Sequence, residues 1–490
     1  MTSTTRAPAP ARNRLGLTLA LLAFAQLIIA VDYTIVFVGL PAIGDGLHFS
    51  EQTLQWVVSA YAVAFGGFLL LGGRAADLFG RRRMFAAGLA LYAISSLVGG
   101  LADGAELLIA ARAVQGLGGA LLSPTLLALI SALFPEGRER NRALAVWGGA
   151  GSSGMVLGSI LGGVLTETVG WRGVFFVNVP LAVAGVIAAF WLIPADRKRE
   201  TGRSFDVAGA LTATLGATLL VFALVQGPAS GWTSPSVLGS LVVALLLLAA
   251  FLLIESRSKD PLMPLRLLRN RSLSTGVAVT AAFMATFGAL AYFFTMYFQE
   301  VLGYNPLTSG FGFVLPCLGV LAGTQIGGRM STRLGVRTTL IVGLALGVVG
   351  TIAFGAAVSP DGSYLTIAPG LAVLSIGQGI LFTAMYAAAL TGVAPEHQGI
   401  GSGIAVTGQQ VGGALGLAVL VAVANASSGS LDGTADAAGI ADGIQTAAYV
   451  AAAGIAVTIG IALTLPRQRR EPTPAIEEPL AAEPVGRSAV

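Results

Sequence analysis

Two ionisable residues, Asp32 and Arg112, stand inside long apolar segments of the chain. Asp32 lies in the segment 15–40 and Arg112 in the segment 107–133. A single charge at the centre of a lipid bilayer costs about 2.5–3.5 kcal/mol on insertion scales. If both segments cross a membrane, the two side chains must therefore face a polar cavity or each other.

The register of the two segments places Asp32 and Arg112 at a similar depth. Asp32 lies eight residues before Leu40, and Arg112 lies five residues after Leu107. At a rise of 1.5 Å per residue, these positions are about 12 Å and about 8 Å from the same side of the membrane. Two interpretations remain open: a static ion pair that joins two helices, or a carboxyl group that exchanges protons as its surroundings change. A proton moving down a potential of 100 mV supplies about 2.3 kcal/mol, a magnitude that could drive such a change.

The composition is that of an integral membrane protein. Of 490 residues, 55% are hydrophobic and only 11% are charged, whereas soluble domains carry about 25% charged residues. The formal charge of +4 does not indicate nucleic-acid binding, because the basic residues lie in short connections between apolar segments. The single cysteine, Cys317, excludes an intrachain disulfide framework.

Apolar segments of about 20 residues predict fourteen membrane-spanning helices. The first segment is too long for the apolar part of a signal peptide, so we expect it to be retained. The predicted spans are 15–40, 54–72, 84–102, 107–133, 143–167, 174–193, 205–225, 236–254, 274–299, 308–328, 338–358, 364–391, 400–424 and 446–465.

The basic residues predict the orientation of these spans. Of the 28 Lys and Arg residues, only Arg112 and Arg172 fall outside the connections and termini on one side. Loops rich in Lys and Arg remain on the cytoplasmic side of a membrane. We therefore expect a multi-pass protein of the bacterial plasma membrane with both termini in the cytoplasm.

Two patterns repeat along the chain at almost the same offset. Gly72-Gly73-Arg74 recurs 255 residues later at Gly327, and the glycines from Gly154 recur 254 residues later from Gly408. The repeat predicts two homologous six-helix halves. The expected segments are a cytoplasmic N-terminal segment 1–14, an N-terminal six-helix bundle 15–200, two additional membrane helices in 201–262, a C-terminal six-helix bundle 263–466 and a disordered cytoplasmic tail 467–490.

The loop between the second and third spans, residues 72–83, carries the strongest local pattern. It reads Gly-Gly-Arg-Ala-Ala-Asp-Leu-Phe-Gly-Arg-Arg-Arg. Glycine permits a tight turn, and Asp77 can pair with Arg side chains or with the N-terminus of the following helix. On its own, the loop also fits a simple topology anchor. It resembles the loop between helices 2 and 3 of the major facilitator superfamily, which acts as a cytoplasmic latch. The resemblance implies this role for Gly73, Arg74, Asp77, Gly80, Arg81 and Arg82.

Further motifs extend the resemblance over nearly the whole chain, toward the fourteen-span drug:H⁺ antiporters of the EmrB/QacA type. The matching segments are 32–41 in the first span, 112–116 in the fourth, 154–163 in the fifth, and 171–172 with 175–180 around the start of the sixth. Phe37 replaces a usual Asn, and Ser159 a usual Pro. The resemblance implies an all-α integral membrane protein with the major facilitator fold, two six-helix bundles plus two additional central transmembrane helices. It also supports proton coupling by Asp32 with Arg112.

A stripe of glycines follows the fifth span. Gly154, Gly158 and Gly162 recur every fourth residue, followed by Gly163. Glycines at this spacing lie on one face of a helix and permit close approach of another backbone. The stripe fits simple helix packing. It also fits a face that slides against its counterpart around Gly408 to Gly416 during alternating access, and the resemblance favours such an antiporter role.

Aromatic, Met and Gln side chains within apolar spans are candidates for substrate contact. Such side chains suit adaptable recognition of flat apolar molecules. The candidates are Gln26, Gln115, Tyr292, Met296, Gln299, Gln378 and Tyr386. Residues of these types more often serve packing alone.

These observations favour proton-coupled export of small hydrophobic or cationic drugs or antibiotics by alternating access. The chain has no Gly-x-x-x-x-Gly-Lys phosphate loop, no His/Cys/acid cluster with metal spacing and no nucleophile–base constellation. We therefore expect a monomeric transporter that is not an enzyme, needs neither metal nor cofactor, and draws on the proton motive force. Two alternatives stay open: a dedicated exporter of one endogenous metabolite or antibiotic, and a membrane receptor that transports nothing.

Overall fold

The computed structural model describes residues 12–49, 51–196, 206–258, 261, 263–428 and 437–466. The basic connection at 197–203 and the tail 467–490, both included in the sequence predictions, lie outside this part. Within the described residues, fourteen helices are long and apolar enough to cross a membrane, which confirms the predicted number of spans.

The helices follow one another along the chain without an intervening strand in the described ranges. They are α1 (Arg12–Leu47), α2 (Glu51–Phe79), α3 (Arg81–Gly100), α4 (Ala105–Leu133), α5 (Arg138–Thr168), α6 (Gly173–Phe176), α7 (Asn178–Leu192), α8 (Val207–Ser230), α9 (Pro235–Arg257), η1 (Leu265–Arg269), α10 (Arg271–Phe283), η2 (Met284–Gly288), α11 (Ala289–Met296), η3 (Tyr297–Val301), α12 (Pro306–Gly312), α13 (Val314–Arg333), α14 (Val336–Ala357), α15 (Tyr364–Leu390), η4 (Pro395–His397), α16 (Gln398–Ser428) and α17 (Ala437–Leu463).

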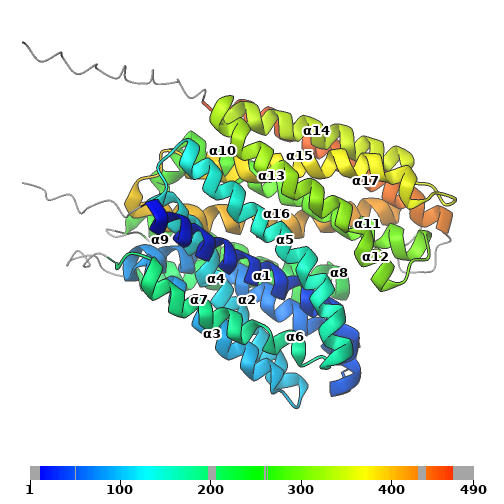
Figure 1. The fold of residues 1–490 in the computed structure, drawn as a ribbon, viewed down its shortest axis with the longest axis horizontal. Helices are drawn as coiled ribbons and strands as arrows, with labels where there is room; N and C mark the ends of the chain where they lie inside the picture. The colour runs from blue at the N-terminus through cyan, green and yellow to red at the C-terminus, as the bar shows by residue number, and fades with distance from the viewer. Residues whose placement is uncertain are drawn as a thin grey trace, which may run out of the picture.

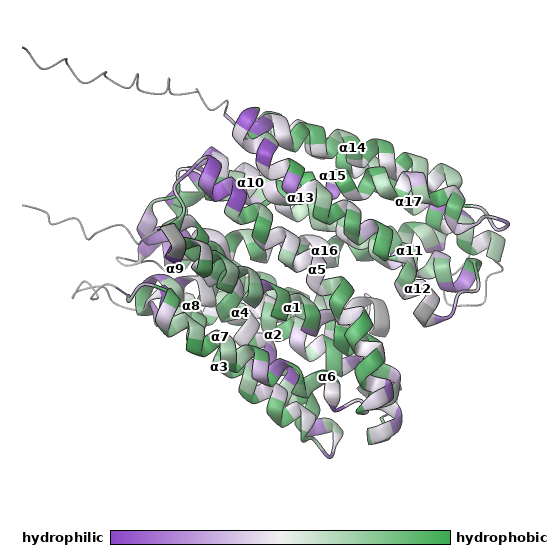
Figure 2. Cartoon of the chain, viewed as in Figure 1, coloured by the Kyte–Doolittle hydropathy of each residue, from purple (hydrophilic) through white to green (hydrophobic). Residues whose placement is uncertain are grey.

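Two helical bundles form the molecule. Helices α1 to α7 pack together as the first bundle, and α10 to α17 as the second. In Figure 1 the first bundle occupies the lower part of the view and the second the upper part, with α5 and α16 between them. The middle of the helices is mostly hydrophobic, and hydrophilic residues gather toward their ends (Figure 2). This distribution is the one expected of a protein that spans a bilayer.

Hydrogen bonds join the two bundles at one end, which we term the Arg-rich end because it holds the turns 80–83, 137–142 and 333–337. Asn141 Nδ2 donates to Thr332 Oγ1 at 3.2 Å, and Gln325 Nε2 donates to the Ala145 carbonyl at 3.2 Å. The Gly392 N–H donates to Glu136 at 3.1 Å. Away from this end the bundles diverge, toward α6 and α12 (Figure 1).

The two additional helices, α8 and α9, pack beside the contact between the bundles. Helix α8 lies against α2, where a Cβ atom at Gly66 would come within 2.9 Å of Val221 Cγ2. It also approaches α16, through a cluster that includes Ala213, Leu70 and Ile404. Helix α9 packs on α8, and only 17% of its most apolar 18-residue stretch is buried within the protein. We infer that α9 is the helix most exposed to lipid.

The ninth span is less regular than its sequence predicts. We expected a continuous helix over 274–299, but two π-helical segments, η2 and η3, interrupt it. A π-helical turn widens the helix and shifts the residues that follow onto another face. The helix faces on which Tyr292 and Gln299 lie therefore cannot be read from α-helical spacing. Tyr292 follows the π-helical segment η2, and Gln299 lies within η3.

The predicted partner of the glycine stripe on α5 is wrong. A Cβ atom at Gly154 would lie 2.9 Å from the Leu27 carbonyl oxygen, and one at Gly158 would lie 2.6 Å from the Val31 carbonyl oxygen. The stripe therefore packs against α1 of its own bundle and not against α16. Periodicity identified the glycine face correctly, but it carries no information on which neighbour approaches that face.

The repeated stripe on α16 behaves in the same way within the second bundle. Gly412 and Gly416 approach the backbone carbonyls of Ala281 and Ala285, which belong to α10 and η2. Each stripe thus joins the fifth helix of a bundle to its first helix. The two glycine faces hold the bundles together internally, in corresponding positions of the repeat.

A matched pair of substitutions tests this packing. Gly158→Ala should lower the free energy of unfolding by about 1–3 kcal/mol, because the new methyl group meets the backbone of α1. Gly163→Ala should be neutral or stabilising, because no atom lies within 4 Å of its added Cβ and Ala favours a helix by about 1 kcal/mol over Gly. Thermal unfolding of the purified variants in detergent measures the difference. Equal midpoints for the two variants would contradict the assignment.

Candidate functional site

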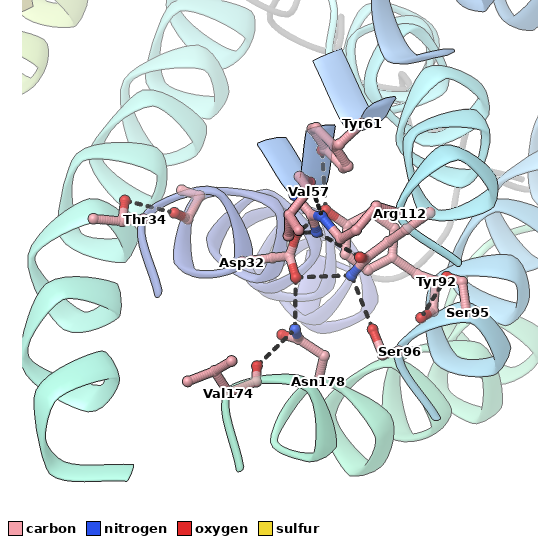
Figure 3. A network of polar contacts seen from close by, with 12 residues as sticks. Asp32, Thr34, Val57, Tyr61, Tyr92, Ser95, Ser96, Arg112, Val174 and Asn178 are labelled. Carbon is pink, nitrogen blue, oxygen red and sulfur yellow. Dashed lines mark hydrogen bonds and ion pairs between the residues drawn. The ribbon is translucent and has the colours of Figure 1, made fainter. Parts of the chain in front are cut away.

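Asp32 and Arg112 form a buried ion pair in the first bundle, as their depths suggested. Arg112 Nη1 donates to Asp32 Oδ2 at 2.9 Å. The Asp32 side chain is 0% exposed and that of Arg112 is 2% exposed. Asp32 projects from α1 and Arg112 from α4, and the two side chains point toward each other (Figure 3). Both charges can therefore lie in an apolar surrounding, because each neutralises the other.

Three further side chains donate hydrogen bonds to the Asp32 carboxylate. Gln115 Nε2 and Asn178 Nδ2 donate to Oδ1 at 2.7 Å and 2.8 Å. Tyr92 donates its hydroxyl to Oδ2 at 3.2 Å. The donors come from α4, α7 and α3, so four helices including α1 meet at one carboxylate (Figure 3). Four donors therefore satisfy the hydrogen-bonding capacity of one buried carboxylate.

The guanidinium of Arg112 has its own supports. Its Nε donates to the Val57 carbonyl at 3.0 Å, and its carbon lies 4.5 Å from the centre of the Tyr61 ring. The Tyr61 and Tyr92 hydroxyls are 3.0 Å apart, which extends the network to α2. Removing one partner of a buried ion pair typically costs about 3–5 kcal/mol, since the other charge is left without compensation. The cluster is therefore sensitive to any change in the charge of Asp32.

The second bundle has no counterpart of this charged pair at the equivalent positions. Phe287 and Ile367, which correspond to Asp32 and Arg112 in the repeat, are buried among apolar side chains. Phe287 stacks on Phe283 with ring centres 5.4 Å apart. The asymmetry expected from the sequence is thus present in the packing.

Asn178 and Tyr92 were not predicted as members of the site. Asn178 stands in the segment Phe175–Pro180, where it is the one polar side chain among apolar neighbours. That isolation is the signal that could have identified it, because a buried amide requires partners. Its Oδ1 atom is buried and has no hydrogen-bond partner among the described residues. Tyr92 gave no comparable signal, since buried tyrosines are common in helical bundles.

Residues 72–83, predicted as a loop, are helical except for Gly80, with 72–79 at the end of α2 and 81–83 at the start of α3. This segment connects the two bundles at the Arg-rich end. Asp77 Oδ1 accepts the Gly399 N–H at 3.0 Å, and Oδ2 accepts the Ile400 N–H at 2.9 Å. Both donors lie in the first turn of α16. Arg81 lies 3.6 Å from Asp77 Oδ1 and also donates to the Pro395 carbonyl. Gly73 lies against the Gly399 carbonyl, and an added Cβ would clash with it.

We expected Asp77 to pair with Arg residues or with the N-terminus of the helix that follows, α3. The ion pair with Arg81 agrees with the first alternative, whereas the helix N-terminus that Asp77 contacts is that of α16. At the start of α3, Asp196 accepts the N–H groups of Arg82 and Arg83, at 3.0 Å and 3.1 Å. Gly80 adopts a φ of +103°, and a side chain at that position would meet Asp196. Spacing along the chain could not identify these contacts, because both acids reach helices far from them in sequence.

Two further residues of the predicted latch, Arg74 and Arg82, lie in the same segment. Arg74 is buried at 4% exposure. Arg82 donates to the Phe190 carbonyl at 2.7 Å and lies 4.9 Å from the centre of the Phe190 ring. Arg82 therefore joins α3 to α7 inside the first bundle, whereas Arg81 and Asp77 reach the second bundle.

The seven candidates for substrate contact do not gather at one place. Gln115 belongs to the Asp32 cluster, where it also donates to Ser96 at 2.9 Å. Tyr386 lies nearer the Arg-rich end and donates to Gln409 at 2.6 Å. Its ring lies 5.2 Å from that of Trp147, which joins α15 to α5 across the two bundles. Trp147 was missed because an aromatic residue in an apolar span carries no distinguishing signal.

The other five candidates are spread over three spans. Tyr292 is exposed, whereas Met296 and Gln299 are partly buried in the same irregular span. Gln26 of α1 lies opposite Gly151 of α5, and Gln378 is half-buried on α15. A role for any of the seven in substrate binding stays a prediction.

Known proteins identify the family of this chain. The sequence model of the family described as the Major Facilitator Superfamily matches residues 22–417. The chain belongs to the major facilitator superfamily. Two solved structures of transporters share its fold. A human organic anion transporter gives a TM-score of 0.68 at 16% identity, over 91% of this chain and 99% of that one. A proton:xylose symporter gives a TM-score of 0.64 at 13% identity, over 92% of this chain and 95% of that one.

Curated relatives of this facilitator are bacterial proteins named for drug resistance or export. It is 37% identical to a puromycin resistance protein of Streptomyces alboniger, over 82% of this chain and 80% of the relative. It is 38% identical to a cephamycin export protein of Amycolatopsis lactamdurans, over 84% and 86%. It is 34% identical to the multidrug resistance protein Stp of Mycobacterium tuberculosis, over 83% and 75%. Together with the fourteen spans, these relatives make this facilitator a multi-pass membrane protein of a bacterial export family.

A substitution at Asn178 tests its part in the carboxylate cluster of this facilitator. Asn178→Leu keeps the side chain branched at Cγ but removes one donor from Asp32, so stability should fall by about 1–3 kcal/mol. Asn178→Asp, which places a second carboxylate 2.8 Å from the first, should be more harmful than Asn178→Leu. Thermal unfolding at several pH values measures both effects. The Asp variant should recover at low pH, when one carboxyl is protonated; a pH-independent difference between the variants would contradict the role.

Proposed function

We propose that this facilitator exports small hydrophobic or cationic drugs or antibiotics across the bacterial plasma membrane in exchange for protons. The observation that carries the proposal is the Asp32 carboxylate, fully buried and held by Arg112 and three neutral donors. A carboxylate so placed can exchange a proton only when the helices around it rearrange. The names of the bacterial relatives support drug export.

The Arg-rich end is proposed to face the cytoplasm, with both termini on that side. The support is the concentration of basic residues in its turns, which membrane proteins keep on the cytoplasmic side. In that orientation the contacts of Asp77 with Gly399 and Ile400 close the cytoplasmic side of the protein. Gly73, Arg74, Asp77, Gly80, Arg81 and Arg82 then act as a latch, which opens when the bundles rock and substrate enters from the cytoplasm.

Proton transfer is proposed to alternate with this rocking. In the closed state Asp32 is ionised and paired with Arg112. A proton that reaches Asp32 removes its charge, so the attraction that holds α1 to α4 weakens and the two helices separate more easily. The energy comes from the proton motive force, and neither a cofactor nor a metal takes part. We expect the unit of function to be a monomer without enzymatic activity.

Everted membrane vesicles that contain the full chain test the proposal. After the vesicle interior has been acidified, a pH-sensitive dye should report proton efflux when a transported drug is added. A panel should include a fluorescent lipophilic cation, several neutral antibiotics and a hydrophilic sugar as the negative control. Movement of no compound, with no proton flux, would favour the receptor alternative.

A dedicated exporter of one endogenous antibiotic remains a second candidate. Relatives named for puromycin resistance and cephamycin export, from Streptomyces and Amycolatopsis, favour it. The same panel separates the two candidates. A multidrug exporter should move several unrelated compounds at comparable rates, whereas a dedicated exporter should move one compound, or close analogues of it, and leave the rest.

A further inference from the structure

The N-termini of four helices at the Arg-rich end differ in the charges placed against them. The positive end of a helix carries the equivalent of about half an elementary charge. Asp77 lies on the first turn of α16 and Asp196 on the first turn of α3, and each carboxylate accepts two backbone N–H groups. Both of these N-termini are therefore compensated by an acid of the chain itself.

The N-terminus of α14 has no acidic residue in its first turn, whereas α5 carries Glu139 in its own first turn. Helix α5 follows Gly137 and α14 follows Gly335, and neither glycine position provides a side-chain cap. The repeat places Thr332 where the first half has Asp77. The Thr332 hydroxyl accepts Asn141 Nδ2 at 3.2 Å, and this neutral contact brings no negative charge to α5.

A cavity of about 500 Å³ lies between the N-termini of α5 and α14. Arg138 and Arg333 line it, from opposite bundles. Ser331, which is 4% exposed, also lines it, and the Ser331 hydroxyl has no hydrogen-bond partner among the described residues. Glu136 is the acidic residue of the lining, and it is engaged by Arg140 at 3.0 Å and by the Gly392 N–H. The site thus offers basic side chains, backbone donors and a buried hydroxyl, with its one carboxylate already paired.

A second cavity, of about 300 Å³, continues from the first. The two share Leu334, Gly335, Val336 and Thr391. Beyond these, the second cavity is lined by polar residues, among them Ser272, Arg337 and Thr338, and by apolar residues, among them Ile341, Leu463 and Leu465. Together the two cavities offer basic side chains next to apolar ones, which suits a molecule with an anionic head and a hydrocarbon body.

We propose that this site binds a phosphate group, which faces the N-terminus of α14 and the Arg side chains of the lining. Helix N-termini and Arg side chains together form a common phosphate-binding arrangement. The apolar residues Ile341, Leu463 and Leu465 of the second cavity favour the headgroup of an anionic phospholipid over inorganic phosphate. Because Arg138 belongs to the first bundle and Arg333 to the second, the bound group joins the bundles and stabilises the closed Arg-rich end.

Binding to the purified full chain tests the site without reference to drug export. Thermal unfolding is measured in nanodiscs of phosphatidylcholine, with added phosphatidylglycerol in one arm and added inorganic phosphate at matched ionic strength in the other. Arg138→Gln and Ser331→Ala should each weaken the apparent affinity for phosphatidylglycerol at least tenfold. Arg266→Gln, at an exposed basic residue of the same end outside the cavity, should leave that affinity unchanged.

A gain-of-charge variant guards against effects of misfolding. Thr332→Asp introduces the carboxylate that the first half already has at Asp77. In phosphatidylcholine alone, this variant should be as stable as the wild type is with phosphatidylglycerol. Its stability should no longer change when phosphatidylglycerol is added. Stabilisation by phosphatidylglycerol alone assigns the site to a lipid headgroup, and equal stabilisation by inorganic phosphate assigns it to the soluble ion. Absence of stabilisation in both arms, or an equal response of Arg138→Gln, Ser331→Ala and Arg266→Gln, would overturn the proposal.

Discussion

Asp32→Asn is expected to abolish proton-driven accumulation of substrate. The amide cannot gain or lose a proton, so transport by this variant cannot draw on the proton gradient. A potential of 100 mV supplies about 2.3 kcal/mol per proton, which corresponds to a concentration ratio of roughly fiftyfold. In everted vesicles the wild type should approach such a ratio. The variant should only equilibrate substrate, at a ratio near one, and its rate should not change with pH.

The buried partner of Asp32 makes a second variant necessary. Asp32→Asn leaves the Arg112 guanidinium without a counter-ion in an apolar surrounding, so lost stability alone could explain lost transport. Adding Arg112→Gln removes the unpaired charge, and the double variant should regain most of its thermal stability. It should nevertheless remain uncoupled from protons. A double variant that still accumulates substrate against its gradient would show that the coupling carboxyl lies elsewhere.

Asp77→Asn is expected to open the Arg-rich end. The Asp77 side chain is 1% exposed and accepts two N–H groups of α16. The amide can accept only through its oxygen, so one buried N–H loses its partner and α16 loses a compensating charge. The combined cost is about 2–3 kcal/mol, which corresponds to a shift of roughly 30-fold to 160-fold away from the closed state. Transport should fall while membrane insertion remains normal.

Asp196→Asn provides the matched control for the latch. Its carboxylate makes the same kind of contact, with two N–H groups at the start of a helix, but within the first bundle. It should therefore lower stability without changing the distance between the bundles. Spin labels at the exposed positions 132 and 334, introduced after replacement of Cys317, measure that distance. Similar distance distributions for the two Asn variants would contradict the latch.

The parts of the account that followed from sequence rest on strong local rules. Fourteen apolar segments predict fourteen spans, since each must satisfy its backbone within a bilayer. The pairing of Asp32 with Arg112 followed from the cost of an isolated buried charge. Neither inference depends on which helices become neighbours, and both agree with the structure.

The parts that failed depend on distant packing. The glycine face of α5 was correct, but its neighbour is α1, because two glycine stripes of similar shape have no sequence feature that pairs them. Asp77 pairs with Arg81, as one of the two predicted alternatives has it, but the helix N-terminus that it contacts belongs to α16 and not to α3. A backbone N–H has no side-chain identity, so an acid that binds one leaves no matching residue in the sequence. Asn178 was overlooked although its isolation in an apolar segment signalled a polar partner.

The central claim is that one buried carboxyl group gains and loses a proton as the bundles rock. Infrared difference spectroscopy of the reconstituted protein, trapped closed or open at the Arg-rich end by cross-links, observes this group directly. The account predicts a protonated-carboxyl band in one state that disappears in the other and is absent from both states of Asp32→Asn. A carboxyl at position 32 that keeps the same ionisation in both states would contradict it.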